Sequence, residues 1–326
     1  MYLLNRAALI VVITGVCLPA HQCMAQARQS YPSKPVRLVV PYSPGNAADI
    51  LARAIGPKMS EAWGQPVIVE NRPGAGSTLG INAVAKATPD GYTLLFVVTS
   101  FVISAALRSD LPYDPIKDFA GVAQIGYPTA VVVVPPGLGV KSVKEFIALA
   151  QNPSGKIIFG SAGAGAGSHL NGERFRLAAG FKAVHVGYKG QPEVLVELLA
   201  GRIHYAVLNQ GVVQPLIKDG RLQALAVLTP QRSPLLPNVP AISEVLPGIE
   251  RDESAAMLAP AATPRAIVNQ VGKEVTRILA LPDIREKMQS IGYIAAPSTP
   301  EECDRTLRKQ IESLTQLVKQ AGLRAM

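Results

Sequence analysis

The chain has 326 residues, of which 48% are hydrophobic and 17% are charged. This composition provides enough apolar material for one large core or two medium ones and excludes a mainly disordered chain. The formal net charge is +9, but the Lys and Arg residues are scattered and aromatic residues make up only 5%. Because no basic stripe is interleaved with aromatic residues, we expect no nucleic acid partner and favour small anionic molecules.

The first 27 residues have the pattern of a secretory leader. Arg6 precedes an apolar run over residues 7–20, and Ala25 and Ala27 supply an Ala-x-Ala cleavage site. The run is shorter than the roughly 20 residues that a membrane-spanning helix needs. We therefore predict that residues 1–27 are a signal peptide cleaved near one of these alanines. Two leader cysteines suggest a lipoprotein as an alternative, but a poor lipobox precedes them.

From residue 31 onward, short apolar runs of strand type alternate with helical patterns. Strands are predicted at 36–42, 66–73 and 92–100, with helices at 46–63 and 78–89 between them. Such alternation indicates βαβ units and a mainly parallel sheet whose two faces are both covered.

A second α/β series follows residue 128. Its first helix has Ser142 as the N-cap and Glu145 as the capping-box partner. Further strands are expected at 129–136, 156–163, 183–190, 203–209 and 222–229, with helices at 168–179 and 192–201. The series is a second α/β unit, similar to the first in architecture but without a fixed-period repeat.

The C-terminal part begins with a proline-rich segment at 232–248, which we expect to form a surface loop. A strand at 254–260 and three helices follow. The last helix has Thr299, Pro300 and Glu302 as N-cap, first residue and capping-box partner. One face of it carries the apolar residues Cys303, Leu307, Ile311, Leu314 and Val318. Cleavage of the leader leaves Cys303 as the single cysteine, so we expect a buried thiol and no internal disulfide.

Four loops follow apolar strands and precede helices, at 42–49, 99–104, 161–169 and 188–191. Ligands of open α/β sheets collect at such positions. The loops consist mainly of Gly, Ser, Thr, Ala and Asn, and the start of a helix offers free N–H groups and a partial positive charge. The sequence therefore predicts an anion site built from backbone amides.

The sequence contains no complete nucleotide-binding motif. In the loop that contains Gly163 and Gly165, Ser168 stands where a dinucleotide fingerprint needs its third glycine, and the next strand lacks the expected acidic residue. Neither Gly155-Lys156 nor Gly272-Lys273 is followed by the Ser or Thr of a P-loop. We therefore expect no nucleotide cofactor.

Catalytic and metal motifs are also weak. A nucleophile elbow needs a glycine two residues before Ser161, where Phe159 stands. Ser168 suits a helix N-cap, and His169 beside it is a possible anion donor. His169, His185 and His204 lie on separate elements without metal-ligand spacing. We predict no catalytic residue and no metal, although an extracytoplasmic hydrolase or isomerase stays open as an alternative.

Several longer segments carry a family resemblance. "VENRPGAG", "PDGYTLL" and "LPYDP", together with "VRLVVPYSPGNAADILAR" and "AVHVGYKGQPEVLVELLAGRI", resemble the Bug receptors, the TctC-type solute-binding proteins of tripartite tricarboxylate transporters. The likeness covers essentially the whole mature chain. It implies a two-lobed periplasmic binding protein of type II-like fold, with a cleft between two doubly wound α/β domains.

The expected lobes follow from this resemblance. Domain 1 is discontinuous and comprises 28–127 and 253–326, and domain 2 comprises 128–252, with linking segments near 126–130 and 250–256. The resemblance implies capture of a small organic carboxylate by a monomer, which delivers it to membrane permease subunits. A sensing receptor without transport is the alternative. Hinge closure on binding is expected, and no cofactor is implied.

The resemblance also implies which residues line the cleft. In these receptors backbone amides and hydroxyls of two facing loops hold the carboxylate. By position, the ligand-binding residues are Tyr42, Ser43, Gly45, Asn46, Ala47, Thr99, Ser100, Ser104, Ser161, Ala164, Gly165, Ser168, His169, Tyr188, Lys189, Gly190 and Asn209. Lys189 is either a cation near the ligand or a solvated loop charge. Asp49 either orients the first loop or complements the helix dipole.

Some positions depart from the family pattern. Asn46 replaces the usual second glycine of the first loop, and we expect it to tolerate left-handed backbone and to add an amide at the ligand. Leu208 replaces an Asp, and Thr99 and Phe101 replace a glycine and a histidine. We expect these changes to make the cleft more apolar, with the Phe101 ring in it, and to favour a hydrophobic or aromatic carboxylate.

Overall fold

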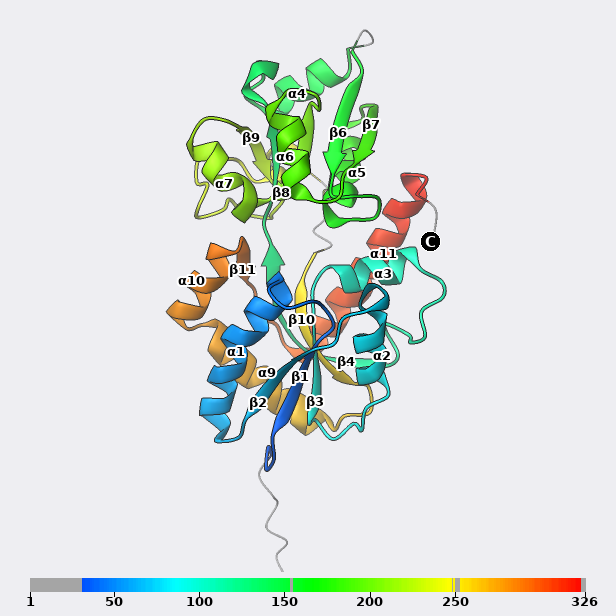
Figure 1. Cartoon of the computed structure of the whole chain (residues 1–326), viewed down its shortest axis with the longest axis vertical. Coiled ribbons are helices and arrows are strands. Elements are labelled where there is room, and N and C mark those ends of the chain that lie inside the picture. Colours follow the sequence, from blue (N-terminus) through cyan, green and yellow to red (C-terminus); the bar gives the residue numbers. More distant parts are fainter. Residues whose placement is uncertain (1–30, 153–154, 248, 250–252, 324–326) are drawn as a thin grey trace, which may run out of the picture. The chain divides into compact units, whose positions relative to one another are not determined.

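The computed structural model describes residues 31–152, 155–247, 249 and 253–323. The predicted signal peptide lies outside these residues. The described chain forms two separate sheets with helices packed on them (Figure 1). Among the described helices, none is both long and apolar enough to cross a membrane.

The first sheet has six strands in the order β11-β4-β10-β3-β1-β2. The strands are β1 (Val36–Val40), β2 (Val67–Asn71), β3 (Thr93–Val97), β4 (Phe119–Pro128), β10 (Ala255–Pro260) and β11 (Tyr293–Ala295). The helices of this part are α1 (Ala47–Trp63), α2 (Thr78–Ala85), α3 (Ser100–Leu107), α9 (Arg265–Leu279), α10 (Pro282–Ser290) and α11 (Pro300–Gln320), with a short 3-10 turn η1 (Ala75–Ser77). The short strand β11 lacks a counterpart in the sequence prediction.

The second sheet has five strands in the order β7-β6-β8-β5-β9. The strands are β5 (Ala130–Val134), β6 (Ile157–Ser161), β7 (Ala183–Gly187), β8 (Tyr205–Asn209) and β9 (Gln223–Val227). Its helices are α4 (Val143–Ala150), α5 (Gly167–Ala179), α6 (Gln191–Leu199), α7 (Gln210–Lys218) and α8 (Ile242–Val245), with the 3-10 turn η2 (Pro136–Leu138). α8 lies in the proline-rich segment, where we expected only a loop.

The predicted parallel βαβ units are confirmed, but each sheet as a whole is mixed. β1 pairs parallel with β2 and β3, and β6 pairs parallel with β7 and β8. In contrast, β10 and β5 run antiparallel to both of their neighbours, and β11 runs antiparallel to β4. The direction of β5 has a local reason. The chain passes from β4 into β5 without a helix between them, so β5 runs opposite to the strands of its sheet that are reached through a helix.

The chain links the two sheets at Thr129, between β4 and β5. The Thr129 N–H donates to the carbonyl of Gly292 at 2.7 Å, and its carbonyl accepts from the Gln210 N–H at 2.8 Å. A second link leads from β9 back to β10. The first sheet therefore takes strands from both the N-terminal and the C-terminal parts of the described chain.

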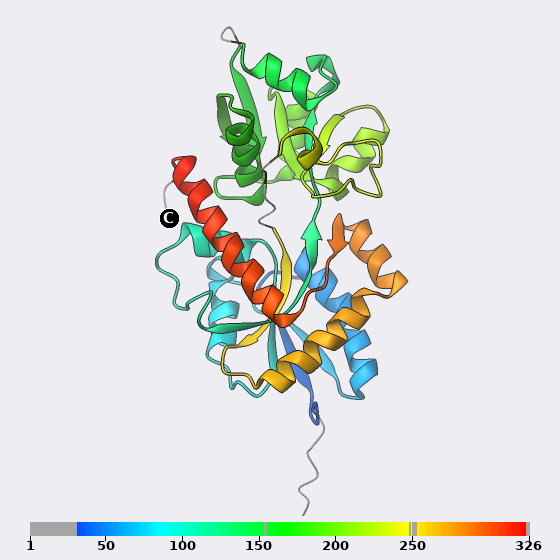
Figure 2. The ribbon, with the colours of Figure 1, turned by 180° about the vertical axis from the view of Figure 1, so that it is seen from behind.

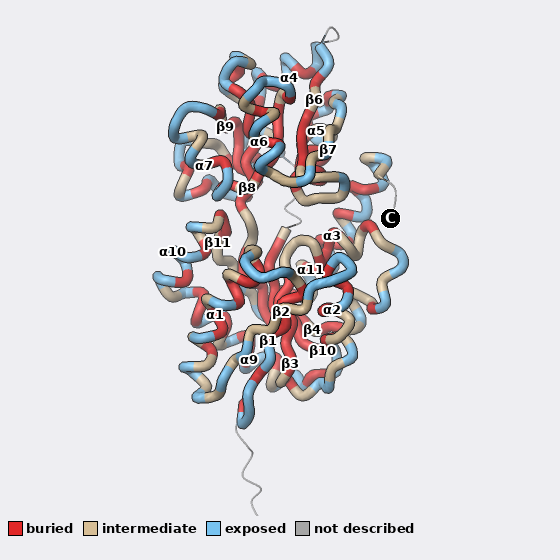
Figure 3. Tube along the Cα trace, viewed as in Figure 1, coloured by how far each residue is buried: buried red, intermediate tan, exposed pale blue. Residues whose placement is uncertain are grey.

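The cores lie against the faces of the two sheets, whose strands are largely buried (Figure 3). α11 packs on β4 and α3 (Figure 2). Its apolar face is buried, including Cys303 as predicted. Thr299 and Glu302 form the predicted capping box. Ser142 caps α4, and the Lys141 N–H donates to Glu145.

Candidate functional site

The first predicted loop joins β1 to α1. Gly45 has φ +84°, a left-handed conformation that suits glycine. Asn46 is extended, with φ −78° and ψ 171°, and acts as the N-cap of α1 by accepting from the Asp49 N–H at 3.1 Å. Its amide nitrogen donates to the Ser43 carbonyl at 2.7 Å. The expectation of a left-handed Asn46 is wrong, because Asn46 is extended and its side chain holds the loop and the helix start together.

Asp49 holds the same loop from the first turn of α1. Its Oδ2 accepts from the Gly45 N–H at 2.9 Å, and its Oδ1 accepts from Arg53 at 2.8 Å and from Asn71 at 3.0 Å. Burial alone would raise the pKa of Asp49, but the hydrogen bond from Gly45, followed by those from Asn71 and Arg53, holds it below 3.8. Asp49 therefore orients the loop as a buried anion.

Free N–H groups are left at the start of α1. The first residues of any α-helix have N–H groups without intrahelical acceptors. Here Asn46 satisfies the Asp49 N–H, and Gly45 is bound to Asp49. Ala48 is fully buried, so among the described residues the Ala47 N–H is the donor that this helix start can offer to an anion.

The second loop is tied to the first through Tyr42. The Ser100 hydroxyl donates to the Tyr42 hydroxyl at 2.9 Å, and the Val98 N–H approaches the same oxygen at 3.4 Å. Thr99 and Ser104 are half-buried. The Thr99 hydroxyl is buried and has no hydrogen-bond partner in the described part of the chain. Tyr42, Thr99 and Ser100 are thus brought together.

The residues expected to make the cleft more apolar lie elsewhere. Phe101 is only 1% exposed and packs in the core of the first sheet, stacked on Tyr113 with its ring centroid 6.4 Å away. Leu208 lies in β8 within a core of the second sheet. That expectation is therefore wrong for both residues, because each points into the core from the element that carries it.

The third loop joins β6 to α5 and is held by internal hydrogen bonds. Ser161 is fully buried; its Oγ lies 2.6 Å from His185 Nε2 and donates to the Gly163 carbonyl at 3.1 Å. α5 begins at Gly167 with Ala166 as its N-cap residue, so Ser168 is not the N-cap that we expected. Instead, the Ser168 hydroxyl accepts from the Ala162 N–H at 3.0 Å.

His169 is also a structural part of this loop. Its Nδ1 accepts from the Gly165 N–H at 3.1 Å, and its ring stacks on that of His185 with a centroid distance of 3.7 Å. Burial, and then the neighbouring His185, lower the pKa of His169 from 6.5 to about 4. A neutral imidazole that is 2% exposed holds the loop rather than presenting a positive charge to a ligand.

The remaining predicted residues follow β7 and β8. The Tyr188 N–H donates to the Ser161 carbonyl at 2.8 Å, which joins this loop to the third one. Lys189 is exposed, and its N–H donates to Glu193 at 3.0 Å. Gly190 precedes α6 in an extended conformation. Asn209 caps α7 by accepting from the Gly211 N–H at 2.8 Å.

The predicted residues form two groups. Tyr42, Thr99 and Ser100 belong to the first sheet's loops, and Ser161, Ser168 and Tyr188 to the second sheet's loops. In the described part of the chain, no hydrogen bond joins loop 42–49 to loop 161–169. The start of α5 does approach α3, because a Cβ at Gly167 would lie 4.0 Å from Ile103 Cδ1.

Sequence reasoning missed two residues that hold these loops. Asn71 ends β2 beside Val40 of β1 and donates to both Asp49 and the Tyr42 carbonyl. His185, which lies in β7, is the partner of Ser161 Oγ at 2.6 Å. Aligning the end of the second predicted strand with the end of the first would have placed Asn71 beside Val40. Within the described residues, no group of three or more His, Cys, Asp or Glu side chains could hold a metal ion.

The chain links two α/β sheets, and polar loops follow β1, β3, β6 and β7. This architecture is that of two-lobed periplasmic binding proteins. The family model described as "Tripartite tricarboxylate transporter family receptor" matches residues 51–323. The chain belongs to this family.

Individual relatives agree with this assignment. A protein of Agrobacterium vitis encoded between ttuE and ttuC′ is 34% identical, with 98% of this chain and 92% of the relative covered. The structure of a TctC solute-binding protein from Polaromonas matches with a TM-score of 0.82 at 25% identity, covering 89% of this chain and all of that one. The structure of Rpa4515 of R. palustris with adipate matches with a TM-score of 0.72 at 31% identity, covering 90% and 98%.

Proposed function

We propose that this receptor captures a small organic carboxylate between the loops of its two sheets and delivers it to the permease subunits of a tripartite tricarboxylate transporter. It acts as a monomer in the periplasm after cleavage of residues 1–27. Family members are periplasmic binding proteins, and the relative from R. palustris was solved with adipate. The leader pattern of the sequence is consistent with export.

The two helix starts are the observation that carries this proposal, because the first N–H groups of an α-helix lack intrahelical acceptors. α1 begins with Ala47 and α5 begins with Gly167, each at the carboxyl end of a strand in a different sheet. Because their loops contain no Lys or Arg, a carboxylate bound there would be held by amide donors and helix dipoles. The Thr99 hydroxyl, in the loop between β3 and α3, is buried and lacks a partner among the described residues. An acid with a carboxylate at each end suits two such helix starts.

A thermal-shift panel tests the ligand class. The purified mature chain is heated with succinate, adipate, citrate, aspartate, benzoate or nicotinate, each at equal ionic strength. We expect at least one carboxylate without an ammonium group to raise the melting temperature, because ligands of the native state stabilise it by mass action. Stabilisation by amino acids alone would contradict the proposal.

We further propose that the lobes comprise 28–127 with 253–326, and 128–252, and that they close around the ligand. The placement of β4 and β5 on either side of Thr129 and the return of the chain to β10 support these boundaries. Closure predicts a smaller radius of gyration by solution X-ray scattering at saturating ligand. An unchanged radius of gyration would argue against a hinge.

A hydrolase is the second candidate, because Ser161 Oγ lies 2.6 Å from His185 Nε2. Burial of Ser161 and its bond to the Gly163 carbonyl count against a nucleophile, which must reach its substrate. Release of product from a carboxylate ester by the unaltered chain, and its absence with Ser161→Ala, would favour an enzyme. Recovery of the acid unaltered favours the receptor.

A further inference from the structure

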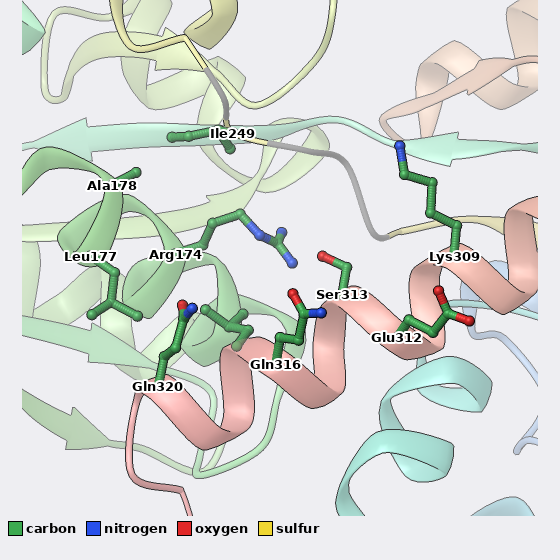
Figure 4. A pocket seen from close by; sticks show the side chains of 10 residues that line it. Arg174, Leu177, Ala178, Ile249, Lys309, Glu312, Ser313, Gln316 and Gln320 are labelled. Carbon is green, nitrogen blue, oxygen red and sulfur yellow. The ribbon is translucent and has the colours of Figure 1, made fainter.

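A groove lies beside β9, an edge strand of the second sheet, and we call it the β9 groove. It has a volume of about 720 Å³, and its apolar wall includes Leu222, Leu225, Val239 and Val245. All of its lining residues lie between positions 136 and 245 and belong to the described chain. None of them lines the cavity at α5 and α11 that Figure 4 shows. The β9 groove therefore belongs to the second sheet and its connections alone.

The strand β9 is paired along one side only. That side pairs with β5, and β9 is last in the strand order of its sheet. On the other side, Val227 is the one paired residue of β9 within the described chain: it bridges Ala241, and its N–H donates to the Pro240 carbonyl at 2.9 Å. Nearer the start of the strand, Gln223 Nε2 donates to the Ala224 carbonyl at 2.9 Å. The backbone of an unpaired strand edge can bind one further strand.

The charges that line the groove favour an acidic partner. Lys141 and Lys144, at the start of α4, line it, and its described lining contains no Asp or Glu. Both lysines are exposed, and neither forms an ion pair within the described chain. The neighbouring carboxylate of Glu145 accepts from the Lys141 N–H at 2.8 Å, which holds it at the helix start. The two ammonium groups are therefore available to carboxylates of a partner.

Further charges lie beside the groove. Lys218 and Arg221 are exposed and flank the lining residue Gly220, with the exposed Asp219 between them. Cations therefore outnumber acidic side chains around the groove as well as in its lining. A surface of this sign attracts an acidic partner and repels a basic one.

The same lysines argue against a second copy of this chain as the occupant. The five residues of β9 carry no charge, so the charge at this edge comes from Lys141 and Lys144 on a different segment. Two copies that paired through β9 would bring these like charges together, which opposes self-association. An anionic membrane surface would use the lysines but leave the strand edge and the apolar wall unused. The three features together fit an acidic protein segment.

We propose that the β9 groove is a docking site for an extended acidic segment of a partner protein, which adds a strand to the free side of β9 and places its carboxylates beside Lys141 and Lys144. Alternate side chains of a strand point to opposite faces. A segment in which acidic and apolar residues alternate therefore offers one face to the lysines and the other to the apolar wall. This docking site does not depend on carboxylate capture by the loops at the starts of α1 and α5.

Fluorescence anisotropy of the mature chain with labelled peptides tests this site. One peptide of about eight residues alternates Glu with Val, which is long enough to pair along a strand. A second peptide of the same length alternates Glu with Pro, so it has the same charge but lacks half of the N–H groups that strand pairing needs. We expect the Glu-Val peptide to bind, and the Glu-Pro peptide to bind at least about tenfold more weakly.

Two double variants test the lysines. Lys141→Gln/Lys144→Gln changes only exposed side chains. We expect it to bind the Glu-Val peptide about tenfold more weakly at low ionic strength, the effect of losing two exposed charge pairs. Lys86→Gln/Lys287→Gln is the matched control, because it removes the same charge from exposed positions outside the groove lining. The control should bind as the unaltered chain does, and circular dichroism verifies that both variants are folded.

The other outcomes would overturn the proposal. Equal binding of the two peptides excludes strand addition, and equal binding by the two double variants excludes the groove lysines. If the Glu-Val peptide does not bind, the lysines only protect the strand edge. If vesicles of phosphatidylglycerol bind the unaltered chain through Lys141 and Lys144 and the peptide does not, the partner is a membrane surface. The carboxylate thermal shift is a separate measurement, so failure of one proposal does not imply failure of the other.

Discussion

The Gly45 N–H donates to Asp49 Oδ2 at 2.9 Å, which closes the loop between β1 and α1 onto the helix that it precedes. The other carboxylate oxygen accepts from Arg53 and Asn71. An anion that is 4% exposed therefore lies just behind the proposed ligand donors and fixes their direction. Asp49 is therefore a positioning residue, and we expect its loss to affect both stability and ligand binding.

Asp49→Asn should destabilise the chain. An amide has a single acceptor oxygen, so its nitrogen must face either the Gly45 N–H or the donors of Arg53 and Asn71. One buried donor then loses its partner, and we expect the free energy of unfolding to decrease by about 1–3 kcal/mol. Urea denaturation followed by circular dichroism measures this change.

Arg53→Gln is the matched control for that experiment. The Arg53 side chain is 53% exposed, so its ion pair with Asp49 should contribute at most about 1 kcal/mol. Equal stability of Asp49→Asn and the unaltered chain would mean that the carboxylate does not hold the loop.

The stability of the chain should depend on pH through His169. Its pKa is about 4 in the folded chain against 6.5 when unperturbed, so between these values the unfolded chain binds more protons. The free energy of unfolding should therefore decrease as the pH falls from 6.5 to 4. Asn at position 169 keeps an acceptor for the Gly165 N–H and does not titrate.

Denaturation of the unaltered chain and of His169→Asn across this pH range measures the contribution. The variant should show a shallower decrease, because it lacks the His169 contribution. A smaller decrease should remain, because burial also lowers the pKa of His185, which is present in both chains. Identical pH profiles would show that His169 is not held neutral.

Ser161→Ala should reduce stability without removing a reaction. The serine hydroxyl contacts His185 Nε2, donates to the Gly163 carbonyl and accepts from the Gly163 N–H at 3.3 Å. Its loss leaves buried groups unsatisfied and should lower the free energy of unfolding by about 1–3 kcal/mol. Carboxylate affinity should decrease through the altered loop, and no ester should be cleaved by either chain. Ester cleavage that depends on Ser161 would identify an enzyme.

Much of the fold is predictable from local sequence. Alternating apolar runs locate β1, β3 and β6, and the capping box at Thr299 and Glu302 locates the start of α11. Strand direction is harder to predict from sequence. β5 runs antiparallel to its neighbours because no helix connects it to β4. β11 is only three residues long and lacks a periodic pattern.

The positions of the loops were predictable, but the directions of their side chains were not. The predicted loops do join β1 to α1, β3 to α3 and β6 to α5. Whether Phe101 points into a cleft or into the core depends on the rotation of α3 on its sheet, which one sequence does not specify. The Asn46 amide likewise serves the local structure, because its oxygen caps α1 and its nitrogen donates to the Ser43 carbonyl in the loop.

The central claim is that backbone N–H groups at the start of α1 hold the carboxylate, and Ala47→Pro tests it. Ala47 is the first residue of α1 and Asn46 before it is extended, so proline fits there as Pro282 and Pro300 do at α10 and α11. Proline removes the N–H, whereas Ala47→Gly keeps it. The measurement is calorimetric titration with the acid that gives the largest thermal shift. We expect Ala47→Pro to bind at least about tenfold more weakly than Ala47→Gly with both chains folded; equal affinities would contradict the account.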